Sequence, residues 1–393
     1  MNFDQHLSQR ARNMVPIAIR TIVRRSSGPE FITFTAGRPA PNLFPIEAIR
    51  EKTDKVLSEQ GSLALQYGGS DGVFGLRTWI AQHMGNRTPD DILVVSGSQQ
   101  VVDLVGKVFV DPGDKVIVAE PTYMGALSSL NVVQPQFLGV PCDDEGMMVA
   151  PLEAALKQGG KLIYVIPNFN NPDGIDMSQS RREAVASLAQ DYNALILEDD
   201  PYGALRFDRE APSALHELAP ERVIYAGSFS KILSPGIRLG WLSAPEEVMP
   251  LLLMAKQAAD LQTSTFTQMI VAELVQDGFM NEQIKRTRAY YKQQRDHILA
   301  ATDRYFPSAV RYETPNGGMF LWCELPNHLN ATAVLEDALA EKVAYIPGEF
   351  FYPNGGGQNT MRLSFSVVTK SEIDKGIEKL GRVFGRAIET ARE

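Results

Sequence analysis

The segment Gly-Ser-Phe-Ser-Lys at residues 227–231 ends in a lysine that could act as a nucleophile. An apolar run precedes it, and Arg238 follows Lys231 by seven residues. A lysine in a partly buried, cationic neighbourhood has a lowered pKa, and its free amine can form a Schiff base with a carbonyl compound. The alternative is that Lys231 is an ordinary solvated charge in a loop.

Asp199 and Ser98 are further candidates because each stands where an apolar run stops. Asp199 follows the run at residues 194–197, so its carboxylate would be half buried and would need a partner. That partner could be a helix cap, an arginine or a protonated ring nitrogen. Ser98 lies in a Ser-Gly-Ser-Gln turn that could bind an anion at a helix N-terminus or serve as a plain N-cap. Neither a dinucleotide fingerprint nor P-loop spacing accompanies it, which disfavours nucleotide binding.

Short apolar runs alternate with helical patterns between residues 92 and 244, and this alternation predicts an α/β fold. The continuous apolar character of the runs is typical of a mostly parallel sheet that is buried on both faces. Polar residues follow four of the runs, and they would meet at the carboxyl edge of the sheet, where ligands bind. The expected strands cover residues 92–95, 115–119, 162–166, 195–197, 223–226 and 241–244, and the clearest helical patterns cover 99–110 and 179–191.

A second domain is expected after a boundary near residues 277–281. A long helical pattern at 279–301 precedes strand-like stretches at 310–313, 319–324 and 361–366, which predicts an α+β unit. The length of 393 residues is also that of two or three structural units.

The composition excludes several classes of function. The chain carries 38 Lys and Arg against 47 Asp and Glu, and a net charge of -9 argues against nucleic acid or anionic lipid as a partner. The two cysteines form no disulfide framework, and the five histidines show no metal-ligand spacing. Neither a signal peptide nor an apolar run of ~18 residues is present. We therefore expect a cytoplasmic protein without a metal or a membrane anchor.

Three motifs together resemble one enzyme family: Glu-Asp-Asp-Pro-Tyr at 198–202, Ser-Phe-Ser-Lys at 228–231 with Arg238, and Asn-Pro-Asp-Gly at 171–174. Their order and spacing resemble those of the class I/II aminotransferases of fold type I, which use pyridoxal 5′-phosphate (PLP). The kynurenine/α-aminoadipate aminotransferase subgroup looks nearest. The resemblance implies a large PLP-binding domain over 41–280 with a mostly parallel seven-stranded sheet. It also implies a small α+β domain made of 1–40 and 281–393.

The resemblance also implies roles around the cofactor. Lys231 resembles the lysine that forms a Schiff base with PLP and then moves a proton, Asp199 the partner of the pyridinium nitrogen, and Tyr123 the ring stacked on the cofactor. Asn171 and Tyr202 resemble the donors to its phenolic oxygen, so Lys231, Asp199 and Tyr202 are the expected catalytic residues. The expected phosphate ligands are Ser98, Gln99, Ser228, Ser230 and Arg238.

Four residues are implied to face the substrate or the partner subunit. Arg362 resembles the arginine that binds the substrate α-carboxylate, beside Asn171, and Gly37 resembles backbone that lets the substrate approach closely. Tyr67 resembles a tyrosine that the neighbouring subunit donates to the phosphate, which implies a homodimer with shared active sites. Arg20, in the segment Ala18 to Ile22, falls on an arginine that reads acidic side chains in some relatives, and its alternative is a solvated charge.

We therefore predict an aminotransferase that exchanges an amino group between an L-amino acid and a 2-oxo acid, with glutamate and 2-oxoglutarate as one expected pair. A β-lyase or decarboxylase on the same PLP site is the alternative, because the protein chooses which Cα bond breaks. A PLP-binding regulator is disfavoured, because the resemblance to the cofactor domain begins near Phe31 and leaves no room for a DNA-binding extension.

Overall fold

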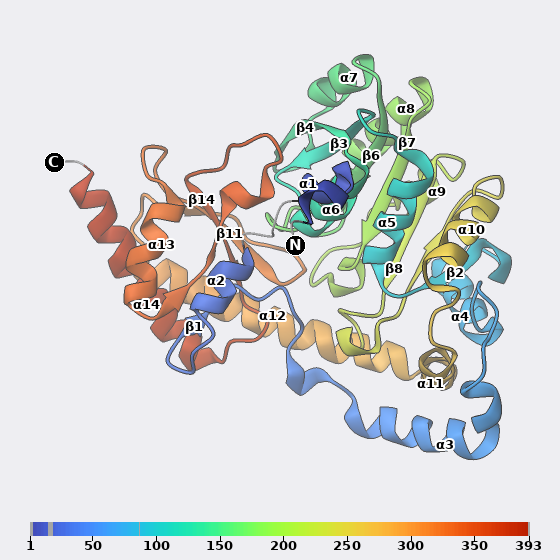
Figure 1. The fold of residues 1–393 in the computed structure, drawn as a ribbon. Coiled ribbons are helices and arrows are strands. Elements are labelled where there is room, and N and C mark those ends of the chain that lie inside the picture. Colours follow the sequence, from blue (N-terminus) through green and yellow to red (C-terminus); the bar gives the residue numbers. More distant parts are fainter. Residues whose placement is uncertain (1–2, 15–18, 86, 392–393) are drawn as a thin grey trace.

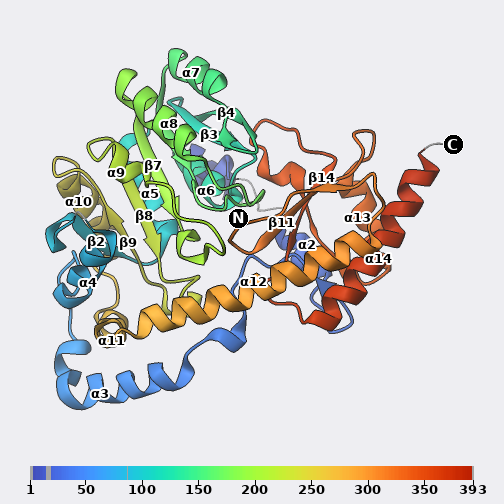
Figure 2. The same ribbon diagram turned by 180° about the vertical axis from the view of Figure 1, so that it is seen from behind.

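Two lobes make up the computed structural model of the chain, which describes residues 3–14, 19–85 and 87–391 (Figure 1). The larger lobe is built on a wide sheet and the smaller one on an antiparallel sheet. The long helix α12 (Phe279–Tyr305) starts beside α11 under the larger lobe and ends in the smaller lobe (Figure 2). One continuous helix therefore connects the two lobes.

The sheet of the larger lobe has the strand order β2-β9-β8-β7-β6-β3-β4-β5. Neighbours from β8 to β4 pair in parallel, whereas β9 runs antiparallel to both β8 and β2. Its strands are β2 (Ile92–Val95), β3 (Lys115–Glu120), β4 (Gln136–Asp143), β5 (Gly146–Met147), β6 (Gly160–Val165), β7 (Leu195–Asp200), β8 (Val223–Ser228) and β9 (Gly240–Ser243).

Both faces of this sheet are buried. Alternate residues of each strand point to opposite sides, and helices pack on each side. Val116 and Tyr164 belong to the apolar cluster that includes the buried residues of α5, whereas Ile117 and Ile163 belong to the cluster of α7 and α8. Continuous apolar runs in the sequence thus correspond to strands that helices cover on both sides.

Helices cover the large sheet and extend below it. Those of this lobe are α3 (Ile46–Ala64), α4 (Phe74–Met84), α5 (Ser98–Phe109), α6 (Met124–Leu130), α7 (Val149–Lys157), α8 (Gln179–Asp191), α9 (Leu215–Leu218), α10 (Met249–Asp260) and α11 (Thr265–Gln276). The N-terminal α1 (Gln9–Arg12) also lies here, and the Asn131 side chain donates a 3.3 Å hydrogen bond to the carbonyl of Asn13.

The smaller lobe contains an antiparallel sheet of order β10-β11-β14-β13 and a parallel pair, β1 and β12. Helix α14 begins with a capping box in which Thr369 and Glu372 satisfy each other's backbone N–H groups, and it packs against α12 and α13. The elements are α2 (Ile19–Arg25), β1 (Ile32–Thr33), β10 (Arg311–Tyr312), β11 (Phe320–Glu324), α13 (Ala331–Ala340), β12 (Val343–Ala344), β13 (Ile346–Pro347), β14 (Thr360–Ser364) and α14 (Lys370–Thr390).

The α/β fold with a mostly parallel sheet is confirmed, and the large sheet has eight strands among the described residues where the resemblance implied seven. Two of the eight, β4 and β5, lie outside the six runs that we expected, and β5 pairs with the end of β4. Strand β4 was not expected, because Gly139 and Pro141 interrupt its apolar pattern. The boundary between 41–280 and 281–393 stays a prediction, since α12 runs through it without a break.

The two cysteines lie one in each main sheet: Cys142 in β4 and the fully buried Cys323 in β11. Burial raises the pKa of both thiols, so both stay protonated at neutral pH. Within the described ranges, His, Cys, Asp and Glu form no group that could hold a metal ion. In the same ranges, no helix combines the length and apolar character needed to cross a bilayer.

Candidate active site

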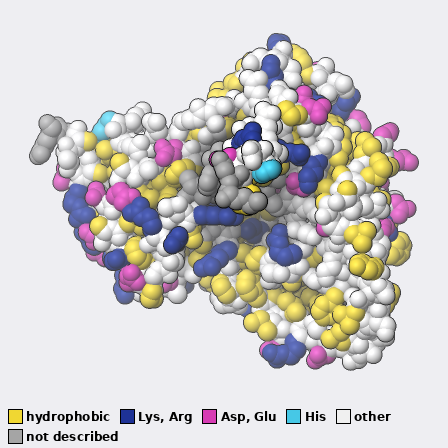
Figure 3. All heavy atoms as spheres, in the orientation of Figure 1, with side chains coloured by type: hydrophobic (Ala, Val, Ile, Leu, Met, Phe, Trp, Pro, Cys, Tyr) yellow, Lys and Arg dark blue, Asp and Glu magenta, His cyan; other side chains and the backbone are white. Residues whose placement is uncertain are grey.

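A cavity of about 860 Å³ opens where the two lobes meet. Four basic side chains line it, from Arg38, Lys231, Arg238 and Arg362, and Figure 3 shows Lys and Arg side chains around the hollow between the lobes. Asp199 is the single carboxylate among the described lining residues. Positive charge therefore dominates the cavity, which suits ligands that carry phosphate or carboxylate groups.

Parallel strands bring separate segments of sequence to one edge of the cavity. Ser98 opens α5 after β2, Asn171 lies in the loop after β6, and Asp199 is near the end of β7. Ser228 ends β8, and Lys231 follows three residues later. All five line the cavity, as expected for residues at the carboxyl ends of parallel strands.

Lys231 is held at the cavity by the backbone of the N-terminal segment. Its Nζ donates a 2.8 Å hydrogen bond to the carbonyl oxygen of Gly37. Burial above all, and the charges of Arg362 and Arg238, lower the pKa of Lys231 to about 8, against the opposing charge of Asp199. About a tenth of the amine is then neutral at pH 7, and the neutral amine is the nucleophilic form.

Asp199 is a buried carboxylate with one oxygen unpaired. Its Oδ2 accepts a 2.8 Å hydrogen bond from the hydroxyl of Tyr164, whereas Oδ1 has no partner among the described residues. Burial raises the pKa of Asp199 to about 7, although the hydrogen bond from Tyr164 lowers it. A buried acceptor without a donor is costly, so this oxygen is suited to a ligand that carries an N–H group.

Arg362 lies in the middle of the small sheet, where Trp322 and Ile346 are its neighbours on β11 and β13. Its Nη1 donates a 2.7 Å hydrogen bond to Oδ1 of Asn171, and Nη2 donates one of 3.0 Å to the carbonyl of Thr35. Its Nε has no partner, and burial lowers the pKa of Arg362 to about 10. The guanidinium remains charged at neutral pH and keeps a free donor for a carboxylate.

The guanidinium of Arg362 is also fixed from its faces. Its central carbon lies 4.3 Å from the ring centroid of Phe320 and 5.2 Å from that of Phe351. A Cβ on Gly37 would come within 3.9 Å of Nη2, so the backbone there lies directly beside the guanidinium. A substrate carboxylate would therefore meet an arginine of fixed orientation.

Arg238 lies against the turn that precedes α5. Its Nη2 donates a 2.8 Å hydrogen bond to the carbonyl of Ser96. Gly97 has a φ of +90°, and a Cβ there would come within 2.7 Å of Arg238 Nη2, so only glycine leaves room for the guanidinium. Arg238 itself has a φ of +52°, a conformation that few residues other than glycine adopt.

The other expected phosphate ligands line the same cavity as Arg238: Ser98, Gln99, Ser228 and Ser230. Ser98 is the first residue of α5, and the Gln99 side chain donates a 2.8 Å hydrogen bond to the carbonyl of Gly125 in α6. The Ser228 hydroxyl accepts a 3.1 Å hydrogen bond from the backbone N–H of Ser230. The start of a helix, hydroxyl groups and a guanidinium together make a suitable site for a dianion.

Two tyrosines line the cavity beside Asn171. Tyr202 is 3% exposed, and its ring meets Phe320 edge-on at 5.8 Å between centroids. Burial raises the pKa of Tyr202 and of Tyr123, so both hydroxyls remain protonated and can donate hydrogen bonds. Tyr123 stands immediately before α6 and is partly buried.

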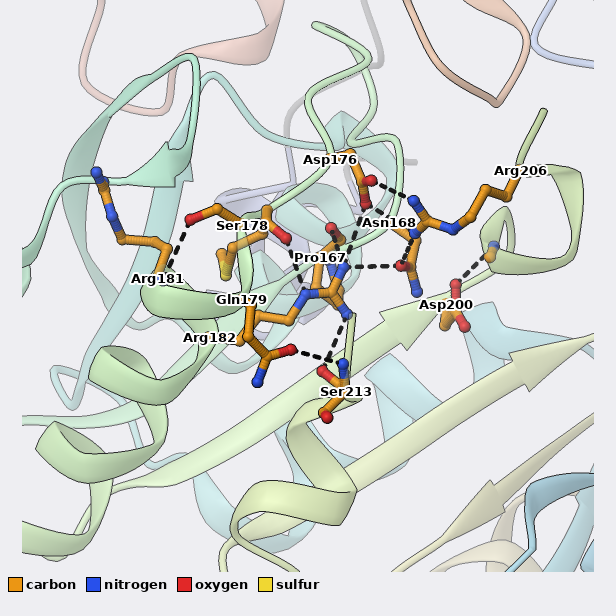
Figure 4. Close-up of polar contacts among 12 residues, drawn as sticks. Pro167, Asn168, Asp176, Ser178, Gln179, Arg181, Arg182, Asp200, Arg206 and Ser213 are labelled. Atoms are coloured by element: carbon orange, nitrogen blue, oxygen red, sulfur yellow. Dashed lines mark hydrogen bonds and ion pairs between the residues drawn. The ribbon is translucent and has the colours of Figure 1, made fainter. Parts of the chain in front are cut away.

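The loop that carries Asn171 is anchored by two buried arginines that the sequence analysis missed (Figure 4). Asn168 Oδ1 accepts hydrogen bonds from Nη2 of Arg182 at 2.8 Å and of Arg206 at 2.9 Å. Both guanidinium groups also bind Asp176, and Arg182 donates to the carbonyls of Pro167 and Met177 as well. The two ends of the loop are thus tied to each other beside the cavity.

Arg20 and Tyr67 do not line the cavity of the single chain. Arg20 is exposed on α2, although its neighbours Ile19 and Val23 do line the cavity, and Ala18 lies outside the described residues. Tyr67 is 76% exposed in the segment between α3 and α4. The bidentate pair of Arg25 with Glu336, at 2.7 and 2.6 Å, fastens α2 to α13.

The residues of the cavity fit PLP. The unpaired Oδ1 of Asp199 can accept a hydrogen bond from a protonated ring nitrogen, and Lys231 offers a partly neutral amine for the aldehyde. The turn before α5 and Arg238 offer donors for a phosphate group. Tyr164 and Thr35 support the site by holding Asp199 and Arg362. No sequence signal pointed to either residue, because each acts through a contact made only in the fold.

Comparisons with known proteins agree with this chemistry. The family described as aminotransferase class I and II matches residues 29–380. The aromatic-amino-acid aminotransferase 1 of Thermococcus litoralis is 40% identical over 97% of this chain and 94% of that protein. The 2-aminoadipate transaminase of Thermus thermophilus is 41% identical over 93% of this chain and 92% of that protein.

A crystal structure shares the whole fold. It is that of LysN, the α-aminoadipate aminotransferase of Thermus thermophilus, complexed with N-(5′-phosphopyridoxyl)-L-leucine. Its TM-score is 0.93 at 38% identity, over 99% of this chain and 100% of that one. The protein therefore belongs to the class I and II aminotransferases, PLP-dependent enzymes of fold type I that transfer an amino group from an amino acid to a 2-oxo acid.

Proposed function

We propose that Lys231, Asp199 and Tyr202 are the catalytic residues of this aminotransferase and that Lys231 binds PLP covalently. One observation carries the proposal: an amine with a pKa of about 8, a buried carboxylate with an unpaired oxygen and a buried arginine meet at one cavity. Ser98, Gln99, Ser228, Ser230 and Arg238 would bind the phosphate, and Tyr123 would stack on the ring.

When bound, PLP supplies an aldehyde for the amino group and a ring that withdraws electrons from the substrate Cα. Lys231 Nζ would then take the proton from the substrate Cα and return it at the cofactor C4′. Asp199 Oδ1 would keep the ring nitrogen protonated, while Asn171 and the hydroxyl of Tyr202 donate to the phenolic oxygen. Each of these roles uses a polar group that already lines the cavity.

Arg362 would bind the substrate α-carboxylate, with Gly37 and Asn171 beside it. Glutamate and 2-oxoglutarate would form one substrate pair. The names of two relatives support a range that includes acidic and aromatic amino acids, since one acts on aromatic amino acids and the other on 2-aminoadipate.

Arg20 would read acidic side chains when α2 covers the substrate. We expect Arg20→Ala to raise KM for glutamate and 2-aminoadipate about tenfold or more, the loss typical of one charged hydrogen bond. Turnover of leucine or kynurenine should change little. Steady-state kinetics with these four donors and 2-oxoglutarate or pyruvate as acceptor provide the measurement.

Arg24→Ala is the matched control, because it removes the same charge from the next turn of α2 and Arg24 is also exposed. It should leave the preference for acidic donors unchanged. Equal losses for acidic and neutral donors in Arg20→Ala would instead indicate a structural role for Arg20.

We further propose a cytoplasmic homodimer with shared active sites, in which Tyr67 reaches the phosphate of the partner subunit. Apolar side chains are exposed on α3, on and just after α10, in the segment that joins α3 to α4 and at the start of α4, and Figure 3 shows apolar patches on the larger lobe. Exposed apolar surface of this kind is typical of a subunit interface. These side chains include Leu57, Leu63, Leu65, Tyr67, Phe74, Leu251, Met254 and Leu261.

A mixing experiment tests the shared site. Lys231→Ala and Tyr67→Ala chains should each be inactive at limiting PLP, whereas a hybrid dimer regains one intact site. Random exchange of subunits should restore about a quarter of the wild-type sites. Activity that stays at the sum of the separate variants, or full activity of a monomer at nanomolar concentration, would contradict the proposal.

A further inference from the structure

Lys256 and Asp260 form an ion pair behind the turn that precedes α5, outside the cavity. Both lie on α10, and Nζ of Lys256 is 2.7 Å from Oδ1 of Asp260. The Lys256 side chain is completely buried, whereas that of Asp260 is 27% exposed. A buried lysine is costly unless it is paired, and an aspartate as the last residue of a helix faces the negative end of the helix dipole. Two unfavourable placements in one pair call for an explanation.

The second oxygen of Asp260 holds the turn. Oδ2 accepts a 2.8 Å hydrogen bond from Nε2 of Gln100 and a 3.3 Å hydrogen bond from the hydroxyl of Ser96. The other end of the Gln100 amide, Oε1, accepts a 2.8 Å hydrogen bond from the backbone N–H of Ser96. Ser96 is therefore fixed through both its side chain and its backbone.

The turn then fixes Arg238. The carbonyl of Ser96 accepts the 2.8 Å hydrogen bond from Nη2 of Arg238, next to the glycine that leaves room for the guanidinium. The contacts run without a gap from Lys256 through Asp260, Gln100 and Ser96 to Arg238. Lys256 also neutralises Asp260, so this carboxylate can hold the turn without repelling an anion bound at the start of α5.

We propose that Asp260, neutralised by Lys256, is a positioning residue that orients Arg238 and the start of α5 toward the phosphate group of the cofactor. The inference rests on the proposed function, because it takes Arg238 as a phosphate ligand. It predicts that loss of the pair weakens binding of the phosphate group and does not change binding of the ring.

Two ligands separate these effects: pyridoxamine 5′-phosphate and pyridoxamine, which share the ring and differ in the phosphate. The full-length, cofactor-free protein is titrated with each, and binding is followed by calorimetry. The double variant Lys256→Met/Asp260→Asn leaves no buried charge unpaired. It should bind pyridoxamine 5′-phosphate about tenfold or more weakly, while its affinity for pyridoxamine stays within about twofold of wild type.

The matched control is Lys107→Met/Asp103→Asn on α5. It removes a Lys–Asp pair of the same spacing, at 2.6 Å, whose side chains are 41% and 32% exposed. It should change neither affinity. Equal losses for both ligands in the α10 variant, or no loss for either, would overturn the inference. If that variant does not fold, Gln100→Met breaks the same chain of contacts and leaves the pair intact, so unchanged selectivity there would overturn the inference as well.

Arg238→Met distinguishes this inference from the proposed function. It should abolish most of the preference for the phosphorylated ligand. If it does not, the assignment of Arg238 to the phosphate is wrong. If it does and the α10 variant keeps full preference, the positioning role of Asp260 is wrong.

Discussion

Replacing Lys231 with alanine should abolish turnover and leave the fold intact. The side chain makes one hydrogen bond, to Gly37, so its loss removes little packing. It also removes the proposed nucleophile and the proposed proton carrier together, and we expect kcat to fall by roughly 10⁴-fold or more. Steady-state kinetics measure the loss, and circular dichroism checks the fold.

Lys231→Arg is the matched control, because it keeps a positive charge at the cavity but offers no free amine. It should be as inactive as Lys231→Ala, and substantial activity would mean that only the charge is needed. Borohydride reduction of the wild type should attach the cofactor to one peptide. An adduct on any residue other than Lys231 would refute the assignment.

Asp199→Asn should retain PLP and lose about two orders of magnitude or more in kcat, because an amide keeps a ring nitrogen protonated far less well than a carboxylate does. Asp200→Asn is the control from the next position. Asp200 accepts hydrogen bonds from Gly203 and Tyr225 and does not line the cavity, so its kcat should fall far less. A near-normal kcat in Asp199→Asn would remove Asp199 from the mechanism.

A stability measurement gives Asp199 a second readout. Its pKa is about 7 in the fold against a usual 3.8, so the folded state binds the proton more tightly than the unfolded state. The contribution of Asp199 to the stability of the cofactor-free protein should therefore fall as pH rises from about 4 to about 7. Asparagine does not titrate, so above pH 7 the cofactor-free variant should be the more stable protein, by roughly 2–4 kcal/mol. Urea unfolding at pH 4 and pH 8 measures the difference.

The sequence was sufficient to predict the strands that carry the site. The expected run at 92–95 coincides with β2, and the long helical pattern from 279 begins where α12 begins. The residues brought together at the cavity lie at the ends of these strands or shortly after them. Their convergence could be predicted because parallel strands end at one edge of a sheet.

The supports of the site could not be predicted in the same way. Arg182 lies in α8 and Lys256 in α10, where a charged residue is normally solvated, and yet both are completely buried. Their partners depend on how α8 and α10 pack against loops far away in the sequence. Tyr164 likewise meets Asp199 only through the pairing of β6 with β7, a register that the sequence does not specify.

The reactivity of the two thiols can report on opening of the fold. Only the thiolate reacts with thiol reagents, and burial keeps both Cys142 and Cys323 in the protonated form. The fully buried sulfur of Cys323 therefore becomes reactive when the small sheet opens, whereas Cys142 is already partly exposed in β4 of the large sheet. The rate at which Cys323 reacts with a thiol reagent therefore reports how often the smaller lobe opens.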